Sequence, residues 1–426
     1  MRTGIIVAIF LFIAELVQSQ TSDTIKTFNV SLEFRPRVEF RNGYKQLRND
    51  TTTPAYFGTQ RSRILFDFKQ KYFKFHTSIQ DIRIWGQYGQ ESINGSLNVF
   101  EAYIEPNIKS NWLLRIGRQN VQLDNGRLFS KSDWSQASKA HDGLNLIFKT
   151  QKINSQLMFF FNQTSERIYE TDYSPSSFSN YKILSVHYFN VKLSEKVTLT
   201  SLNSADGYQS LTNKNVLYVR GNSGGRIEFT HKNLYLTLSG YYQYGNISSG
   251  NKVEAYYLQP EIKYAVSKKI TSSLGCEYVS GDDATKNNSI SRSFVPLYGV
   301  THKFMGNMDY FTKFPNDVKN GGLINPYLFL TYKISKKLSI RADEHLFYLQ
   351  NKVIDNNKVI NPYLGFENDL SLKYKFNEFI TFDFGFSFLL AEKSMEILKA
   401  GNSNKNNIWS FVMITFNPEL FNSLKW

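Results

Sequence analysis

Arginine and carboxylate side chains recur on alternate positions near the start of the chain. In the stretch from Phe28 to Arg41, FNVSLEFRPRVEFR, every second residue from Asn29 onward is polar, and the later ones are Glu or Arg. Arg carries a permanent charge and a planar pair of N–H donors, a geometry that suits carboxylates and other oxyanions. This pattern therefore predicts the pairing and recognition of anions.

Residues of the same kind continue through the N-terminal third of the chain. The candidate anion-binding residues are Arg35, Arg37, Arg63, Arg83, Arg115, Arg118 and Arg127. Their candidate acidic partners are Glu33, Glu39, Asp67, Asp81, Glu101 and Asp124. For any single arginine, a wall charge that only pairs with its neighbours is as consistent with the sequence as a binding site. For the group as a whole, a role in selecting anions is the favoured interpretation.

The element that must position these charges is a β-strand. In Phe28 to Arg41 the residues between the polar ones are all apolar, and a period of two places the two sets on opposite faces of a strand. One entirely apolar face and one charged face suit a strand with lipid on one side and a water-filled lumen on the other. The stretches Leu234 to Tyr244, Tyr363 to Tyr374 and Glu378 to Phe388 repeat this alternation.

The connections between the expected strands alternate between short and long along the whole chain. A tight turn at Gln70 to Lys71, for example, is followed by a long connection from Gln87 to Ser96 and a short one from Asn107 to Asn111. This is the asymmetry of an outer-membrane barrel, which has short periplasmic turns and long extracellular loops. The sequence predicts an all-β, membrane-spanning antiparallel barrel of about 18 strands, wide enough to leave an aqueous channel.

The N-terminal residues 1–20 have the composition of a cleaved secretory signal peptide, with one Arg and then the apolar run Ile5 to Ile13. The expected barrel domain is 21–426. The chain has a negative mean hydropathy and no later apolar run long enough for a helical span. Its 15% aromatic content suits the aromatic girdles of a barrel in the outer membrane of a Gram-negative cell.

Composition also limits the partners. Cys276 is the single cysteine and none of the six His is paired at metal-ligand spacing, so neither a disulfide, a metal site nor a cofactor is expected. The formal net charge of +14 favours acidic partners: lipopolysaccharide among the outer-membrane lipids, or acidic solutes. Nucleic acid is not an expected partner of an exported chain.

Four short stretches resemble one family of outer-membrane proteins. They are QDIRIWG (80–86), EAYI (101–104), LRIGRQ with the following NGRLFSKSDW (114–134), and a late block that contains HKFMGNMDYF and SKKLSIRADEHLFY. In their order and spacing they resemble the alginate-export family over nearly the whole mature chain. The resemblance implies a monomeric eighteen-stranded barrel with an Arg-rich, anion-selective constriction for a uronic-acid polymer. It favours Arg83, Arg118 and Arg127 within that constriction, and it does not fix the solute or the direction of transport.

Several local features remain open in the sequence. In Phe73 to Trp85 the alternation changes phase near Ile79, where a β-bulge would return Asp81 and Arg83 to the lumen. Gly117 would do the same for Arg118.

Asp343, His345 and Tyr348 form a further expected inward row, which would turn Glu344 towards lipid. The longest connection, Asp283 to Asn320, mixes apolar and polar residues, so it either folds into the pore or packs on the extracellular rim.

The favoured function is passive, anion-selective passage of an acidic polysaccharide or of acidic oligosaccharides. A general diffusion pore without sugar specificity is the principal alternative. A barrel enzyme is disfavoured because no GxSxG or similar nucleophile pattern is found. A purely adhesive barrel would have no use for a charged lumen, and a plugged TonB-dependent transporter would need a domain ahead of the first strand.

Overall fold

The computed structural model describes residues 26–89, 96–171, 173, 181–286 and 289–425. In this part of the chain, 18 long strands form one closed antiparallel barrel. They are β1 (Thr27–Asn42), β2 (Ala55–Lys69), β3 (Phe73–Ile84), β4 (Asn98–Lys109), β5 (Trp112–Gln119), β6 (His141–Lys149), β7 (Ile153–Phe161), β8 (Ile183–Lys192), β9 (Val197–Gln209), β10 (Leu217–His231), β11 (Leu234–Asn246), β12 (Lys252–Ala265), β13 (Ile270–Val279), β15 (Leu323–Lys333), β16 (Leu338–Leu349), β19 (Tyr363–Lys375), β20 (Ile380–Ala391) and β21 (Asn407–Phe416).

The smaller elements lie in the connections and at the C-terminal end. They are β14 (Ile290–Ser291), β17 (Ile354–Asp355), β18 (Lys358–Val359), β22 (Glu419–Asn422), the 3-10 helix η1 (Asn316–Val318) and the helix α2 (Ser394–Lys399). No helix among the described residues is long and apolar enough to cross a membrane. The expected signal peptide, 1–20, lies outside the described residues.

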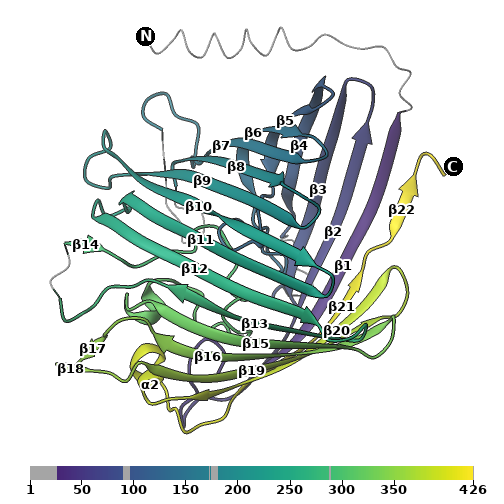
Figure 1. The fold of residues 1–426 in the computed structure, drawn as a ribbon. Helices are drawn as coiled ribbons and strands as arrows, with labels where there is room; N and C mark the ends of the chain where they lie inside the picture. Colours follow the sequence, from purple (N-terminus) through teal and green to yellow (C-terminus); the bar gives the residue numbers. More distant parts are fainter. Residues whose placement is uncertain (1–25, 90–95, 172, 174–180, 287–288, 426) are drawn as a thin grey trace.

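The barrel closes where its first and last strands meet. β1 pairs with β2 on one side and with β21 and β22 on the other, all antiparallel (Figure 1). The predicted architecture and the strand number are therefore confirmed.

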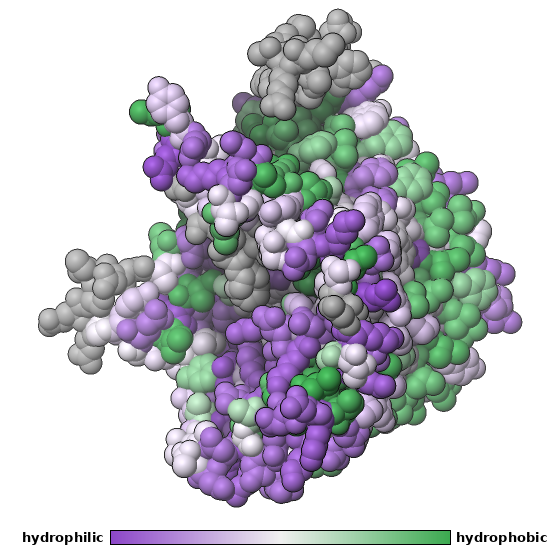
Figure 2. All heavy atoms as spheres, turned by 90° about the vertical axis from the view of Figure 1, so that its left-hand side faces the viewer, coloured by the Kyte–Doolittle hydropathy of each residue, from purple (hydrophilic) through white to green (hydrophobic). Residues whose placement is uncertain are grey.

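The two faces of β1 are those that the alternation predicts. Val38 is 45% exposed on the outer face, whereas Glu39, the next residue, is 1% exposed in the interior. In Figure 2 hydrophobic side chains form a band along the side of the barrel, and the end that carries the long loops is mostly hydrophilic. The apolar band matches the surface that lipid covers in an outer-membrane barrel.

The connections alternate as predicted. At one end of the barrel the connections are turns of two to four residues, such as 110–111 and 376–379. At the other end they are longer loops, of which 280–322 is the longest. The long-loop end is the extracellular end.

β3 and β5 keep a single phase, in contrast to the bulges that the sequence suggested. β3 pairs with β2 without a break, and the register shift at this point falls on β4, where Phe100 is the extra residue. β5 pairs with β6 without a break through Gly117. Side chains alternate along an unbroken strand. Asp81 and Arg83 therefore lie on the same outward face as Ile79, and Arg118 lies on the same outward face as Ile116.

Candidate pore constriction

Two of the extracellular loops turn into the barrel. The first inward loop (120–140) joins β5 to β6, and the second inward loop (280–322) joins β13 to β15. The two loops are paired with each other through a bridge between Phe129 and Tyr298. Of the two alternatives for the second loop, the structure shows the inward one. The inward fold of the first loop was not predicted.

The second inward loop is held by side chains of the inner wall. Its Phe304 carbonyl oxygen accepts a hydrogen bond from Asn325 Nδ2 at 2.8 Å, and its Met308 N–H donates to Glu367 at 2.8 Å. Phe311 is fully buried against Phe347 of β16, with ring centroids 4.7 Å apart. These contacts occupy the extracellular half of the lumen.

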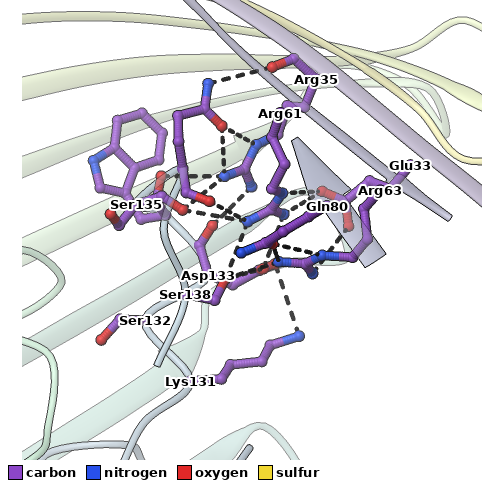
Figure 3. A network of polar contacts seen from close by, with 12 residues as sticks. Glu33, Arg35, Arg61, Arg63, Gln80, Lys131, Ser132, Asp133, Ser135 and Ser138 are labelled. Carbon is purple, nitrogen blue, oxygen red and sulfur yellow. Dashed lines mark hydrogen bonds and ion pairs between the residues drawn. The ribbon is translucent and has the colours of Figure 1, made fainter. Parts of the chain in front are cut away.

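Four arginines of β1 and β2 bind the first inward loop and are here termed the arginine ladder: Arg35, Arg37, Arg61 and Arg63. Figure 3 shows Arg35, Arg61 and Arg63 with their partners. Arg35 donates to the carbonyl oxygens of Asp133 and Ser135, at 2.7 and 2.9 Å. Arg37 donates to the Trp134 carbonyl oxygen at 3.0 Å.

The other two members of the ladder combine carboxylate and amide partners. Arg61 binds Glu33 and also Asp133, the latter at 3.0 Å. Arg63 donates to Gln80 Oε1 at 2.6 Å and lies 3.7 Å from Glu33. All four side chains are buried, with at most 7% of each residue exposed. The ladder therefore fixes the loop in place as well as charging the wall.

Positive charge exceeds negative charge at this wall. Glu39 lies 2.9 Å from Arg37 in an ion pair, and it accepts hydrogen bonds from Arg41 at 2.8 Å and from the indole of Trp409 at 3.0 Å. Around the ladder, four inward arginines (Arg37, Arg41, Arg61 and Arg63) share three carboxylates, those of Glu33, Glu39 and Asp133. Since Arg35 donates its hydrogen bonds to neutral oxygens, its charge is not cancelled by a direct carboxylate contact among the described residues.

Arg127 and Asp124 anchor the first inward loop elsewhere. Arg127 is fully buried and pairs with Glu277 of β13 at 3.1 Å, and it donates to the Val300 carbonyl oxygen at 3.1 Å. Asp124 accepts from the hydroxyls of Tyr188 and Tyr241, at 3.0 and 2.9 Å. The loop thus reaches from β1 and β2 across to β8, β11 and β13.

Arg115 and Glu101 face the lumen apart from the ladder. Arg115 pairs with Glu105 at 2.7 Å and lies over the ring of Tyr103. Glu101 accepts from the Asn120 N–H at 3.1 Å, at the start of the first inward loop. A further predicted acid, Asp67, binds His76 Nδ1 at 3.0 Å.

Arg83 and Arg118 lie on the outer face, not in the lumen. Arg83 pairs with Asp81 at 2.6 Å on the face of β3 opposite Gln80, and its side chain is 45% exposed. Arg118 pairs with Asp142 at 2.6 Å and is 40% exposed. Both lie close to the extracellular ends of their strands, where headgroups and water can solvate a charge. This position removes the need for the bulges that the sequence suggested.

Other expectations are met in part. Asp343 and His345 face inward, and the unbroken alternation of β16 then places Phe347 inward and turns Tyr348, which was expected inward, to the other face. Glu344 faces outward as expected, and its carboxylate accepts from Asn368 at 2.6 Å.

Sequence reasoning missed Arg61, the most buried member of the ladder. Arg61 is two positions from Arg63, so the alternation that places Arg63 in the lumen would also have placed Arg61 there. Asp133, the loop carboxylate that binds Arg61, had no periodic signal because it lies outside any strand. No group of three or more His, Cys, Asp or Glu among the described residues could hold a metal ion.

A closed barrel with an apolar outer band and two loops folded into a charged lumen defines an outer-membrane porin. The particular family follows from sequence: the alginate-export family model matches residues 26–391, and the chain belongs to this family.

Solved structures share the fold. OccAB1 of Acinetobacter baumannii is 12% identical with a TM-score of 0.65, over 92% of this chain and 97% of that one. The outer membrane protein opdK of Pseudomonas aeruginosa is 10% identical with a TM-score of 0.64, over 93% and 99%. A comparison with curated proteins gives no match. Family membership and the closed barrel together make the protein a porin of the outer membrane.

Proposed function

We propose that this porin gives passive, anion-selective passage to an acidic polysaccharide or acidic oligosaccharides such as uronates. The observation that supports this most directly is the excess of arginine at the constriction, where four inward arginines share three carboxylates and a fifth, Arg35, is bonded to neutral oxygens. In a confined site of low dielectric such an excess attracts anions and repels cations. Family membership is consistent with an acidic polysaccharide as solute.

The test is the single-channel conductance of the refolded protein in a planar bilayer, with the anion-to-cation permeability ratio measured before and after adding oligouronates. The proposal expects a ratio above one and a current block by oligouronates. A neutral oligosaccharide of the same length serves as control and should block less. A ratio near one without block would instead assign the protein to general diffusion porins.

A further inference from the structure

A second group of cations lines the lumen on a different sector of the wall, formed by β10 to β16. It consists of Arg226, Lys263 and Arg341, which face inward, and of Lys303 from the second inward loop. Lys263 and Arg341 lie within a few residues of the short-turn ends of their strands, so this group is on the periplasmic side of the inward loops.

Aromatic rings connect these cations to one another. Arg226 donates to the hydroxyl of Tyr235 at 2.7 Å, and Lys263 Nζ lies 5.3 Å from the centre of the same ring. Further along the wall, the guanidinium of Arg341 lies 4.7 Å from the centre of the Phe329 ring. Cation–π contacts of this kind restrict the positions of flexible charged side chains.

Tyr327 joins the two halves of the group. Its ring stacks on Phe329 with centroids 4.3 Å apart, and its hydroxyl donates to Glu261 at 2.9 Å. The ring crosses Gly275 of β13, where a Cβ atom would lie 2.4 Å from the Tyr327 ring. Glycine at this position is therefore what allows Tyr327 to reach β12.

Lys303 completes the group from the second inward loop. Its Nζ donates to the carbonyl oxygen of Asn125 at 3.0 Å, and the Asn125 side chain donates to Gln259, one inward position from Glu261. Desolvation lowers the pKa of Lys303, and the neighbouring charges of Arg226 and Arg341 lower it further. The loop thus adds a cation to a wall that already carries three.

The accessibility of this group differs from that of the arginine ladder. The side chains of Lys263 and Arg341 are 45% and 43% exposed, and Lys303 is also exposed, whereas Arg61 of the ladder is completely buried. Glu228, Glu261 and Asp343 lie beside Arg226, Lys263 and Arg341, so Lys303 leaves the group with an excess positive charge. A solute in the lumen can touch Lys263, Lys303 and Arg341 directly, whereas only 10% of the Arg226 side chain is exposed.

We propose that Arg226, Lys263, Lys303 and Arg341, held by Tyr235, Tyr327 and Phe329, form a carboxylate-binding station for acidic saccharides on the periplasmic side of the inward loops. This inference rests on the proposed function and deepens it. The ladder sets the field and holds the loop, while this exposed station makes the direct contacts with sugar carboxylates. Ring-held cations are preorganised, so a carboxylate that binds them loses little affinity to side-chain ordering.

The experiment measures how long trigalacturonate blocks single channels of the wild type and of the variants Lys263→Gln, Lys303→Gln and Arg341→Gln. The matched control is Lys373→Gln, which removes one exposed lumen-facing cation that also neighbours a carboxylate, Asp383, from β19 outside the station. Folding of each variant is checked by heat-modifiable migration in gels. Because all four side chains are exposed, the barrel should form.

We expect the residence time of trigalacturonate to be shortened roughly five-fold in each station variant, because each one loses a single exposed charge contact. The residence time should change little in Lys373→Gln. Equal shortening in Lys373→Gln would overturn the station but leave the proposed function intact, since only general wall charge would then matter. A wild-type channel with no anion preference and no block would overturn the proposed function itself and, with it, this inference.

Discussion

The guanidinium of Arg61, on β2, lies 3.0 Å from the carboxylate of Asp133, 72 residues later in the chain and inside the first inward loop. The same guanidinium binds Glu33 of β1. One fully buried side chain therefore ties two neighbouring strands to the segment that narrows the lumen.

Replacing Arg61 with Ala should release the first inward loop. The change leaves Glu33 and Asp133 without their shared partner, and since both carboxylates are partly exposed, the loss of these charged hydrogen bonds costs about 1–3 kcal/mol of stability. We expect a lower unfolding temperature in detergent and frequent conductance steps as the loop moves. Arg83→Ala is the matched control because that arginine is paired but exposed on the outer face. A quiet current and an unchanged unfolding temperature in Arg61→Ala would contradict this role.

The two inward loops approach each other closely at Gly299. A Cβ atom there would lie 1.8 Å from the Arg127 carbonyl oxygen, a distance that forces the backbones apart. Gly299→Ala should therefore increase protease cleavage in both loops while the barrel stays intact. Gly240→Ala is the control, since the nearest atom to its Cβ would be a Leu258 side-chain carbon at 3.3 Å. Equal protease resistance in both variants would show that the loops do not depend on this contact.

Docking of the first inward loop should strengthen at alkaline pH. Lys139 donates to the carbonyl oxygens of Tyr298 and Gly299, and burial lowers its pKa from 10.5 to about 8. Between these two pH values a released loop binds more protons than a docked one, so docking becomes more stable as the pH rises through this window.

The measurement is the frequency of loop-opening events from pH 7 to pH 10.5, compared with Lys139→Met. Only the difference between the two proteins reports on this lysine, since other groups also titrate. Openings that become more frequent with pH in the wild type alone would reverse the predicted sign.

Neutralising Arg83 and Arg118 should leave ion selectivity unchanged. Both side chains are on the outer face beside a carboxylate, and headgroup water and salt screen them from the lumen. Arg35→Gln, in contrast, removes a buried charge surrounded by neutral oxygens and should lower the anion-to-cation permeability ratio. The measurement is the anion-to-cation permeability ratio of each variant in a planar bilayer that separates two salt solutions. A fall in Arg118→Gln as large as in Arg35→Gln would refute the assignment of faces.

The fold could be predicted because several strands carry a clear alternation and the connections alternate in length along the whole chain. The alternation in β1 correctly places Arg35, Arg37 and Glu39 in the interior, and the short and long connections give the strand number. Their roles in binding anions remain predictions.

The candidate site was less accessible to sequence reasoning for two reasons. Arg83 and Arg118 are polar residues on an outward face, which a strand tolerates near the membrane interface, so polarity alone did not reveal their side. The contact of Asp133 with Arg61 is nonlocal, and no periodic pattern records which loop enters a lumen.

The seam between β1 and the C-terminal strands also constrains biogenesis. The Phe28 N–H donates to Ser423 Oγ, 395 residues away in the chain, and β1 pairs with both β21 and β22. β1 is synthesised first, but the backbone hydrogen bonds of its second edge form only after β21 and β22 have been synthesised. Such long-range pairing folds slowly and leaves an open edge exposed to aggregation in the meantime. The delivery of this porin to its membrane thus depends on keeping a nearly complete, unclosed chain in a folding-competent state.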